Sequence, residues 1–317
     1  MQSRVLVTGA AGFIGSYIVD WLLEQGCEVI GVDNFVLGRK ENLHRALAND
    51  NFDLLAVDMA DYDLSYQAIT EAAKGRIDFV WHMAASSDIS AGVADPAIDL
   101  RNTFMTTYNT IAIMRELAVP RLAFASSSAI YGDRGDTLTE DSGPLFPISN
   151  YGAMKLASEG IISAAVEGFL DRAWIFRFPN VVGKRSTHGV IYDFINKLRG
   201  DTSLLKVLGD GTQCKGYLHV SDLLSAMNYI VDKASDKLNY FNIGNNDDGA
   251  TVEFIARTVV NSMAPGANIK YGRGNKGWVG DVPHVKYSIE KLETLGWKPE
   301  LSSEGAIQRA VTEQIEG

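Results

Sequence analysis

A serine, a tyrosine and a lysine near the middle of the chain form the pattern with the clearest chemistry. Tyr151 precedes Lys155 by four residues, and side chains at this spacing share one face of a helix. A nearby ammonium favours the phenolate, so we expect Lys155 to lower the pKa of Tyr151 toward neutral pH. Ser127 follows an apolar run, and its hydroxyl can share a proton with a substrate oxygen. The trio suits removal of a proton from an alcohol while a nicotinamide accepts hydride.

The first thirty residues contain a pattern that could bind such a nicotinamide cofactor. Residues 4–8 are apolar enough for a strand, and apolar residues recur at helical spacing over 13–23. Between the two segments Gly9 would allow a sharp turn, and Gly12 would let the backbone approach a pyrophosphate. Gly15 would let the helix pack closely against the strand. The pattern predicts a dinucleotide-binding turn.

Asp33 ends the second predicted strand, at 28–32, where a carboxylate can bind ribose hydroxyls on the adenine side. The same charge would repel a 2′-phosphate, so we predict NAD as the cofactor in preference to NADP. Arg39 and Lys40 lie a few residues further on and could meet a phosphate, but we interpret them as exposed charges.

Strand-like and helix-like segments alternate through the first half of the chain. Further strands are predicted at 52–57, 79–82, 122–126 and 173–178, and helices at 64–73, 99–117 and 151–166. This alternation predicts an α/β fold, a doubly wound parallel sheet of the Rossmann type. Ligands of such sheets bind beyond the carboxyl ends of the strands, so we expect the residues that follow the strands to converge. They are Asp33, Asp58, Met83, Ser127 and Pro179.

The alternation becomes irregular after about residue 179, and glycine, asparagine, lysine and tryptophan cluster at 272–278. We therefore expect residues 1–178 to form the NAD-binding domain. Residues 179–317 should form mainly a smaller C-terminal substrate-binding domain. Some segments, at about 217–245, could return to the first domain.

Composition excludes several classes of protein. The chain has 317 residues, 46% of them hydrophobic, enough for one large α/β domain and a smaller one. A net charge of −10 without a basic run argues against nucleic acid as a partner. The two cysteines and five histidines show no ligand spacing, so we expect no metal site. We expect a cytoplasmic protein without a membrane partner, since no stretch suits a bilayer span or a signal peptide.

A set of short motifs makes the chain resemble a known family over essentially its whole length. They are TGAAGFIG at 8–15, DNFVLG at 33–38, DM at 58–59, HMAA at 82–85, SSSAIYG at 126–132, YGAMK at 151–155, RFPNVVG at 177–183, GDGTQ at 209–213, HVSD at 219–222 and NIG at 242–244. The chain resembles the extended short-chain dehydrogenase/reductase family, and within it the nucleotide-sugar 4-epimerases of the UDP-glucose 4-epimerase type.

The resemblance implies roles for individual residues. Ser127, Tyr151 and Lys155 would be catalytic, and the last two would also contact NAD. The other residues around the cofactor would be Gly9, Gly12, Phe13, Ile14, Gly15, Asp33, Asn34, Gly38, Asp58, Met59, Met83, Ala84, Ala85, Thr103 and Pro179. The residues around the nucleotide sugar would be Ser87, Ser128, Asn180, His188, Val190, Lys206 and Lys215.

Three positions depart from the pattern of that family. Thr103 stands where asparagine is common, and Lys215 and Trp278 stand where arginines for the diphosphate are expected. A lysine is a point charge and lacks the bidentate fork of arginine. Other cations that could compensate are Arg185, Arg273 and Lys276.

The activity that the resemblance implies is an NAD-dependent nucleotide-sugar 4-epimerase, acting on a UDP-hexose through a transient 4-keto sugar. Dehydratases of this family use an Asp-Glu pair directly after the catalytic hydroxyl residue, and here Ser128 and Ala129 stand there. A reductase or decarboxylase on the same scaffold is an alternative. A non-catalytic NAD-sensing protein is another, although such a protein would be expected to lack one of the trio. The resemblance also implies a homodimer, with helices 99–117 and 151–166 in a four-helix contact.

Overall fold

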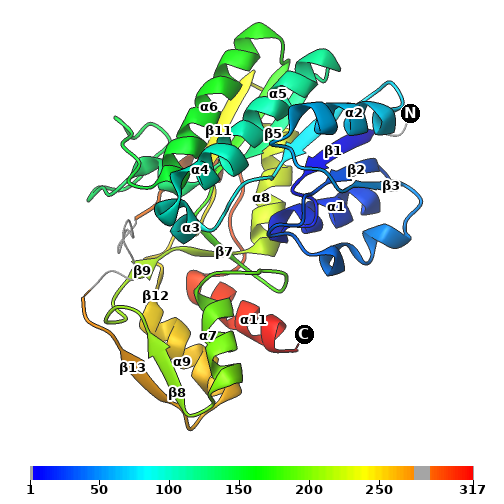
Figure 1. The fold of residues 1–317 in the computed structure, drawn as a ribbon. Helices are drawn as coiled ribbons and strands as arrows, with labels where there is room; N and C mark the ends of the chain where they lie inside the picture. The colour runs from blue at the N-terminus through cyan, green and yellow to red at the C-terminus, as the bar shows by residue number, and fades with distance from the viewer. Residues whose placement is uncertain (1–2, 275–285, 317) are drawn as a thin grey trace. The chain divides into compact units, whose positions relative to one another are not determined.

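A computed structural model describes residues 3–274 and 286–316 (Figure 1). The chain divides into two compact units. Unit 1 comprises residues 1–130, 149–177 and 231–240, and unit 2 comprises residues 131–148, 178–230 and 241–317. Residues 131–148, which we expected in the first domain, therefore group with unit 2. The segment that returns to unit 1 is 231–240.

Unit 1 is built on a seven-stranded sheet with the order β11-β6-β5-β4-β1-β2-β3. The strands are β1 (Arg4–Thr8), β2 (Glu28–Val32), β3 (Phe52–Leu55), β4 (Phe79–His82), β5 (Arg121–Ala125), β6 (Arg172–Arg177) and β11 (Leu238–Asn242). Neighbours from β3 through β6 pair in parallel. The prediction of a doubly wound parallel sheet is confirmed, because the chain runs outward from β1 in both directions.

Helices cover both faces of this sheet. The longer ones are α1 (Phe13–Glu24), α2 (Tyr62–Ala73), α5 (Thr106–Glu116) and α6 (Asn150–Gly168), and the short ones are η1 (Lys40–Leu43), η2 (Ala46–Ala48), α3 (Ile89–Ala94), α4 (Pro96–Asp99), η3 (Leu100–Met105) and η4 (Ser128–Tyr131). Helix α5 packs between α2 and α6 over one face, while α1 packs on β1 and β2 on the other face (Figure 1).

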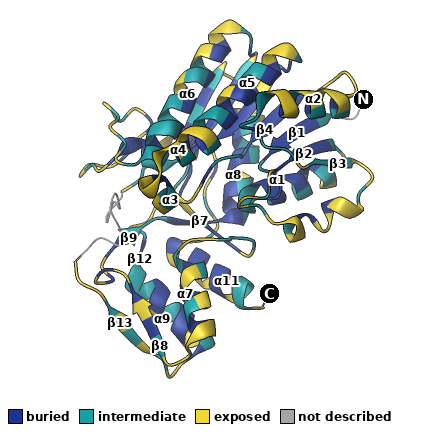
Figure 2. Cartoon of the chain, viewed as in Figure 1, coloured by how far each residue is buried: buried dark blue, intermediate teal, exposed yellow. Residues whose placement is uncertain are grey.

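The two faces of the sheet bury different kinds of side chain, because successive residues of a strand point in opposite directions. Under α2, α5 and α6 the core is mainly aliphatic, as in Leu6, Ile30, Val80, Leu122 and Ile175. The opposite face carries aromatic rings, with Trp21–Trp81, Phe79–Trp174 and Trp81–Phe176 contacts between centroids 5.4–6.4 Å apart. Figure 2 shows the strands as the buried layer between exposed helix surfaces. Because both faces of the sheet are buried, the ends of its strands, which the expected site residues follow, are held in place.

The single helix predicted over 99–117 is wrong in one respect. The chain forms α4, then six π-helical residues in η3, and only then α5. Thr106 and Thr107 donate side-chain hydrogen bonds to the carbonyl of Thr103, at 2.9 and 3.0 Å. Such bonds compete with the regular helical ladder and bend helices, and here they accompany the wider turn.

Unit 2 combines three pairs of short strands with a helical core. Its elements are β7 (Asn180–Val182), α7 (Val190–Gly200), β8 (Leu204–Val207), β9 (Cys214–Lys215), β10 (Tyr217–His219), α8 (Val220–Lys233), β12 (Ala250–Thr251), α9 (Val252–Met263), β13 (Asn268–Tyr271), α10 (Glu290–Leu295) and α11 (Ser303–Glu316). Strand pairs β7–β10 and β8–β13 are parallel, and β9–β12 is antiparallel. Helices α7, α9 and α11 pack on one another around buried aliphatic side chains.

Over residues 3–274 and 286–316, no helix combines the length and the apolar character that a bilayer crossing requires.

Candidate active site

The turn after β1 is shaped by glycines at positions where side chains would collide. Gly9 has a φ of +69°, and a Cβ there would lie 2.8 Å from the backbone nitrogen of Ala84. A Cβ on Gly15 would overlap the carbonyl of Gly9. Gly12 is the N-cap of α1 and provides no side-chain acceptor for the first N–H groups of the helix. The turn therefore exposes backbone donors at a helix N-terminus, which is the geometry of an anion site.

Asp33 closes this turn from the end of β2. Its carboxylate accepts hydrogen bonds from the backbone N–H of Ala11 at 2.9 Å and of Phe35 at 2.8 Å. Burial raises the pKa of Asp33, and the backbone N–H groups oppose that shift. A Cβ on Gly38 would lie 2.6 Å from the carboxylate, so this glycine permits the following loop to approach Asp33. Asn34, beside it, is exposed and accepts a hydrogen bond from the Val36 N–H.

The segment after β4 is held against β1 and η3. The N–H of Met83 donates to the carbonyl of Thr8, and that of Ala84 donates to the Thr8 hydroxyl. Thr103 is fully buried, and its hydroxyl accepts a hydrogen bond from Ser86 N–H at 3.1 Å. Thr103 therefore supports the backbone of the loop that contains Ala85 and Ser87.

Asp58 and Met59 follow β3 at the same edge of the sheet. The Asp58 carboxylate pairs with the exposed guanidinium of Arg101 at 2.9 Å. The carbonyl of Met59 accepts a hydrogen bond from Asn109 at 2.9 Å, and its side chain is buried in the core. Arg101 was missed by the sequence analysis, because nothing local links η3 to a residue 43 positions earlier.

Ser127, Tyr151 and Lys155 come together where β5 ends and α6 begins. Ser149 caps α6 by accepting a hydrogen bond from Gly152 N–H at 3.1 Å. Lys155 is 2% exposed, and its ammonium donates to the carbonyl of Ala125 at 2.6 Å. That nitrogen lies 5.8 Å from the centroid of the Tyr151 ring.

Electrostatics of the trio differ from the sequence-based expectation. Burial raises the pKa of Tyr151 to about 12, a hydrogen bond with Ser127 lowers it in part, and the Asp99 carboxylate raises it. Burial also lowers the pKa of Lys155 to about 7, against the attraction of Glu159 and Asp99. The expected net lowering of the tyrosine pKa by Lys155 is therefore wrong. Burial is the largest influence on the pKa of each group.

A second buried group lies one helical turn further along α6. The guanidinium of Arg177, at the end of β6, binds both carboxylate oxygens of Glu159, at 2.7–3.2 Å. The hydroxyl of Ser126 also donates to Glu159. This ion pair was not predicted from the sequence. The spacing of Lys155 and Glu159 does place Glu159 on the same helix face as Lys155, and this spacing was the available signal that Glu159 is buried beside the trio.

The residues expected to bind the sugar nucleotide are divided between the units. In unit 1, Ser87 is exposed and Ser128 is half-buried at the start of η4. In unit 2, Asn180 begins β7 and Val190 begins α7. The remaining three lie on β8, on β9 and in the exposed loop before α7, and they are Lys206, Lys215 and His188.

Pro179 belongs to unit 2 and packs beside two glycines. A Cβ on Gly216 or Gly244 would lie 3.7 or 3.6 Å from the proline ring. Gly216 directly follows Lys215, so Pro179 and Lys215 lie in the same part of unit 2. Trp278 and Lys276 lie outside the described residues.

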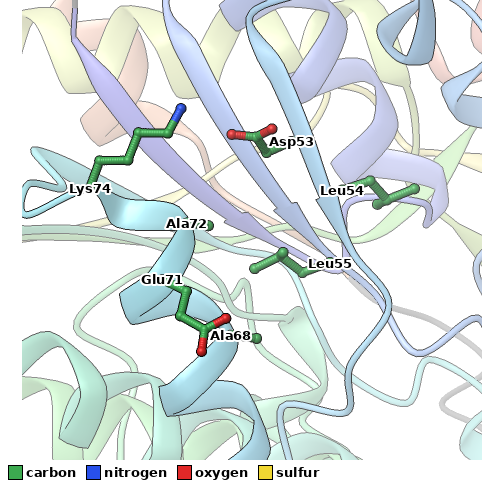
Figure 3. Close-up of a pocket in the computed structure, with 7 residues that line it drawn as sticks. All are labelled: Asp53, Leu54, Leu55, Ala68, Glu71, Ala72 and Lys74. Atoms are coloured by element: carbon green, nitrogen blue, oxygen red, sulfur yellow. The ribbon is translucent and has the colours of Figure 1, made fainter.

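One surface hollow, of about 370 Å³, lies between the edge strand β3 and helix α2 (Figure 3). Three strands separate β3 from β5, the strand that precedes Ser127. Its lining residues are Asp53, Leu54, Leu55, Ala68, Glu71, Ala72 and Lys74. The hollow contains none of the expected site residues, so we assign it no part in the chemistry.

Comparison with known proteins places the chain in a family. Residues 5–244 match the model of the NAD dependent epimerase/dehydratase family. The chain belongs to this family. Its activity is therefore that of an enzyme of the epimerase/dehydratase class.

Relatives of this epimerase/dehydratase have more than one activity. A putative UDP-glucose 4-epimerase from Methanocaldococcus jannaschii is 30% identical over 97% of each chain. UDP-glucuronic acid decarboxylase 2 from Arabidopsis thaliana is 29% identical over 94% of this chain, which spans 65% of that protein.

Solved structures of similar chains include epimerases. A UDP-galactose 4-epimerase is 35% identical and superimposes with a TM-score of 0.85 over 99% of this chain and 98% of that one. The UDP-glucose 4-epimerase of Thermus thermophilus, in complex with NAD, is 29% identical, with a TM-score of 0.84 over 98% of this chain and 99% of that one.

NAD is the cofactor of this family, and unit 1 of this epimerase/dehydratase fits it. Side chains on Gly9 or Gly15 would fill the turn that the pyrophosphate requires. The first turn of α1 has no side-chain cap competing for its N–H groups. The Asp33 carboxylate stands at the end of β2, where ribose hydroxyls are bound in such folds.

Proposed function

We propose that this chain is an NAD-dependent nucleotide-sugar 4-epimerase acting on a UDP-hexose. The observation that carries the proposal is the make-up of the catalytic trio and its surroundings. Ser127, Tyr151 and Lys155 are all present, and the trio combines a phenol, a hydroxyl partner and a buried cation. Ser128 and Ala129 follow directly, so no carboxylic acid stands there to expel a hydroxyl group from the sugar.

The residues of unit 1 divide the work in this proposal. NAD, when bound, supplies the acceptor and later the donor of the hydride at C4 of the sugar. The Tyr151 phenolate oxygen removes the proton from the 4-hydroxyl and returns it to the same oxygen after the sugar has turned over. The Ser127 hydroxyl hydrogen-bonds to that oxygen, and the Lys155 ammonium stabilises the phenolate.

The burial of Lys155 has a second role in the proposal. A 4-keto sugar is open to hydration and to loss of its neighbouring proton in water. Lys155 is 2% exposed and Thr103 is fully buried, so solvent does not reach these two side chains. Electrostatic interactions are stronger in such a dry environment.

A decarboxylase is the second candidate, because a decarboxylase is among the relatives. Oxidation at C4 of a UDP-glucuronic acid places a ketone β to the C6 carboxylate, and such an acid loses carbon dioxide readily. The same trio would perform the oxidation. The two candidates therefore differ in substrate and product and share the first step.

The experiment is turnover in heavy water with product analysis by NMR, after the bound NAD has been measured. Substrates are UDP-, CDP-, GDP- and dTDP-hexoses, together with UDP-glucuronic acid. We expect the C4 epimer of a UDP-hexose, without deuterium on any sugar carbon. A UDP-pentose with released carbon dioxide would replace the proposal by the decarboxylase. Deuterium at C5 in a 6-deoxy-4-keto product would indicate a dehydratase, and no turnover despite bound NAD would indicate a sensor.

A further inference from the structure

Asp99, the last residue of α4, is the most unusual charged side chain of unit 1 outside the trio. The residue is 0% exposed. Neither of its carboxylate oxygens has a hydrogen-bond partner within residues 3–274 and 286–316. An unpartnered buried carboxylate destabilises a fold, so its presence calls for another explanation than packing.

The surroundings of Asp99 direct it toward the start of α6. Helix α4 packs on α3, on η3 and on α6. A Cβ on Gly92 of α3 would collide with the Asp99 carboxylate, so this glycine makes room for it. The carbonyl of Gly92 accepts a hydrogen bond from Asn150 at 2.9 Å, and Asn150 directly precedes Tyr151. The π-helical turn of η3 follows Asp99, and π-helical segments occur frequently at functional sites.

A count of buried charges shows which group lacks a counter-charge. Glu159 is bound through both oxygens by Arg177, so these two charges balance. The Lys155 ammonium donates to the carbonyl of Ala125, a neutral acceptor. Asp99 is the buried carboxylate next to α6 that no guanidinium or ammonium already binds within the described residues.

Other titratable groups lie on the elements around α4 and α6. They are Asp88 at the N-cap of α3, Asp95 at the N-cap of α4, Arg101 on η3, His82 on β4, Glu159 on α6 and Arg177 on β6. Asp88 adds negative charge near Asp99, and Arg101 is exposed and paired with Asp58. Burial lowers the pKa of His82 to about 3, so this side chain is neutral.

We propose that Asp99 is a positioning residue whose carboxylate provides the counter-charge for Lys155 and thereby sets the pH range in which Tyr151 and Lys155 work. The part of this inference that concerns catalysis rests on the proposed function. The part that concerns the charge of Lys155 stands without it.

The direction of the effect follows from the charges. The Glu159 carboxylate, already bound by Arg177, and after it ionised Asp99 attract the proton of Lys155 and raise the pKa of that ammonium. Ionised Asp99 repels the phenolate and raises the pKa of Tyr151. Burial raises the pKa of Asp99 itself to about 6. Both influences of Asp99 are therefore present above pH 6 and fade as Asp99 takes up a proton below it.

The test replaces Asp99 by asparagine, which keeps the shape and removes the charge. Both limbs of the pH profile of kcat should move to lower pH, by about one unit. NMR of ¹³C-labelled lysine, with Lys155 assigned by a Lys155→Met variant, should show its titration moving the same way without any substrate. The matched control is Asp95→Asn, which removes a carboxylate from the same short helix and preserves an N-cap. We expect the control to leave both titrations unchanged.

Stability supplies a third measurement and a safeguard against misfolding. The pKa of Asp99 in the folded protein lies above its ordinary value of 3.8, so its ionisation opposes folding fully above about pH 6 and not below about pH 4. Asp99→Asn should therefore resist urea better than the wild type at pH 8, and equally at pH 4. Gly92→Ala, which must displace the carboxylate, is a second variant expected to shift both titrations in the same direction.

The outcomes separate the two proposals. A stability gain in Asp99→Asn with an unmoved Lys155 titration would reduce Asp99 to a structural residue and overturn the inference. If the wild type turns over no nucleotide sugar, the proposed function fails. The lysine titration then still decides whether Asp99 provides the counter-charge.

Discussion

Two polar clusters in unit 1 share the segment that follows β5 and helix α6, while β6 adds Arg177 to one cluster and α4 adds Asp99 to the other. The closed cluster consists of Ser126, Glu159 and Arg177, and the open cluster consists of Ser127, Tyr151, Lys155 and Asp99. Ser126 and Ser127 follow one another after β5, and Ser126 belongs to the closed cluster while Ser127 belongs to the open cluster. Lys155 and Glu159 lie one helical turn apart on α6, with Glu159 in the closed cluster and Lys155 in the open cluster.

The clusters differ in how completely their charges are satisfied. In the closed cluster the guanidinium of Arg177 and the carboxylate of Glu159 form three hydrogen bonds, with side chains 9% and 8% exposed. In the open cluster Lys155 donates to one carbonyl, and Asp99 has no hydrogen-bond partner in the described part of the chain. The comparison teaches that burial alone does not define a catalytic group. Groups left without strong partners retain protonation equilibria that a reaction can use.

The largest effect should come from Tyr151→Phe in the open cluster. Loss of the acid/base group should lower turnover by about a hundred-fold to ten-thousand-fold. The free energy of unfolding should change by about 1 kcal/mol or less, since a single hydroxyl group is lost. Stopped assays and urea titrations measure the two quantities. Tyr108→Phe, at an exposed position of α5, is the control, and full activity in Tyr151→Phe would place the chemistry elsewhere.

The next effect should come from Arg177→Met in the closed cluster, and it should appear in stability. Removing one partner leaves Glu159 as an uncompensated buried charge, which costs about 3–5 kcal/mol. The double variant Arg177→Met/Glu159→Met should recover part of this loss, because both charges are then gone. Denaturant unfolding of the wild type, both single variants and the double variant completes the cycle. A loss below about 1 kcal/mol for Arg177→Met would mean that the clusters do not differ as described.

The smallest effect should come from the same replacement in the open cluster, Lys155→Met. NAD affinity should fall by about tenfold or more with the loss of a charged donor, while stability is retained or rises. The pKa of Lys155 in the folded protein, about 7, lies below its ordinary value of 10.5. The ammonium therefore opposes folding fully below pH 7 and not above pH 10.5, so the gain should shrink as the pH rises. Calorimetric titration with NAD and urea unfolding near pH 6.5 and pH 9.5 check both expectations. If Lys155→Met loses as much stability as Arg177→Met, the two clusters do not differ in how completely their charges are satisfied.

Much of unit 1 was predictable because its signals are local. The strand predicted at 79–82 and the helix predicted at 151–166 agree with β4 and α6 to within two residues. Hydrophobic runs with glycine or aspartate at their ends specify such elements without reference to the rest of the chain. The π-helical turn in η3 was not predictable from periodicity, because apolar residues recur at nearly the same spacing in an α-helix and in a single wider turn.

The sequence by itself determined the parallel sheet, the glycine turn and the spacing that places Tyr151 and Lys155 on one helix face. Those features depend on residues close together in the chain. Tertiary structure alone decided the pKa shifts of Tyr151 and Lys155, since the loss of water around these two groups arises from packing. It also decided the partners of Arg177 and Asp99, because Glu159 and Gly92 reach them only when separate elements meet. Charge balance in a buried site is a property of the folded neighbourhood, which no short stretch of sequence contains.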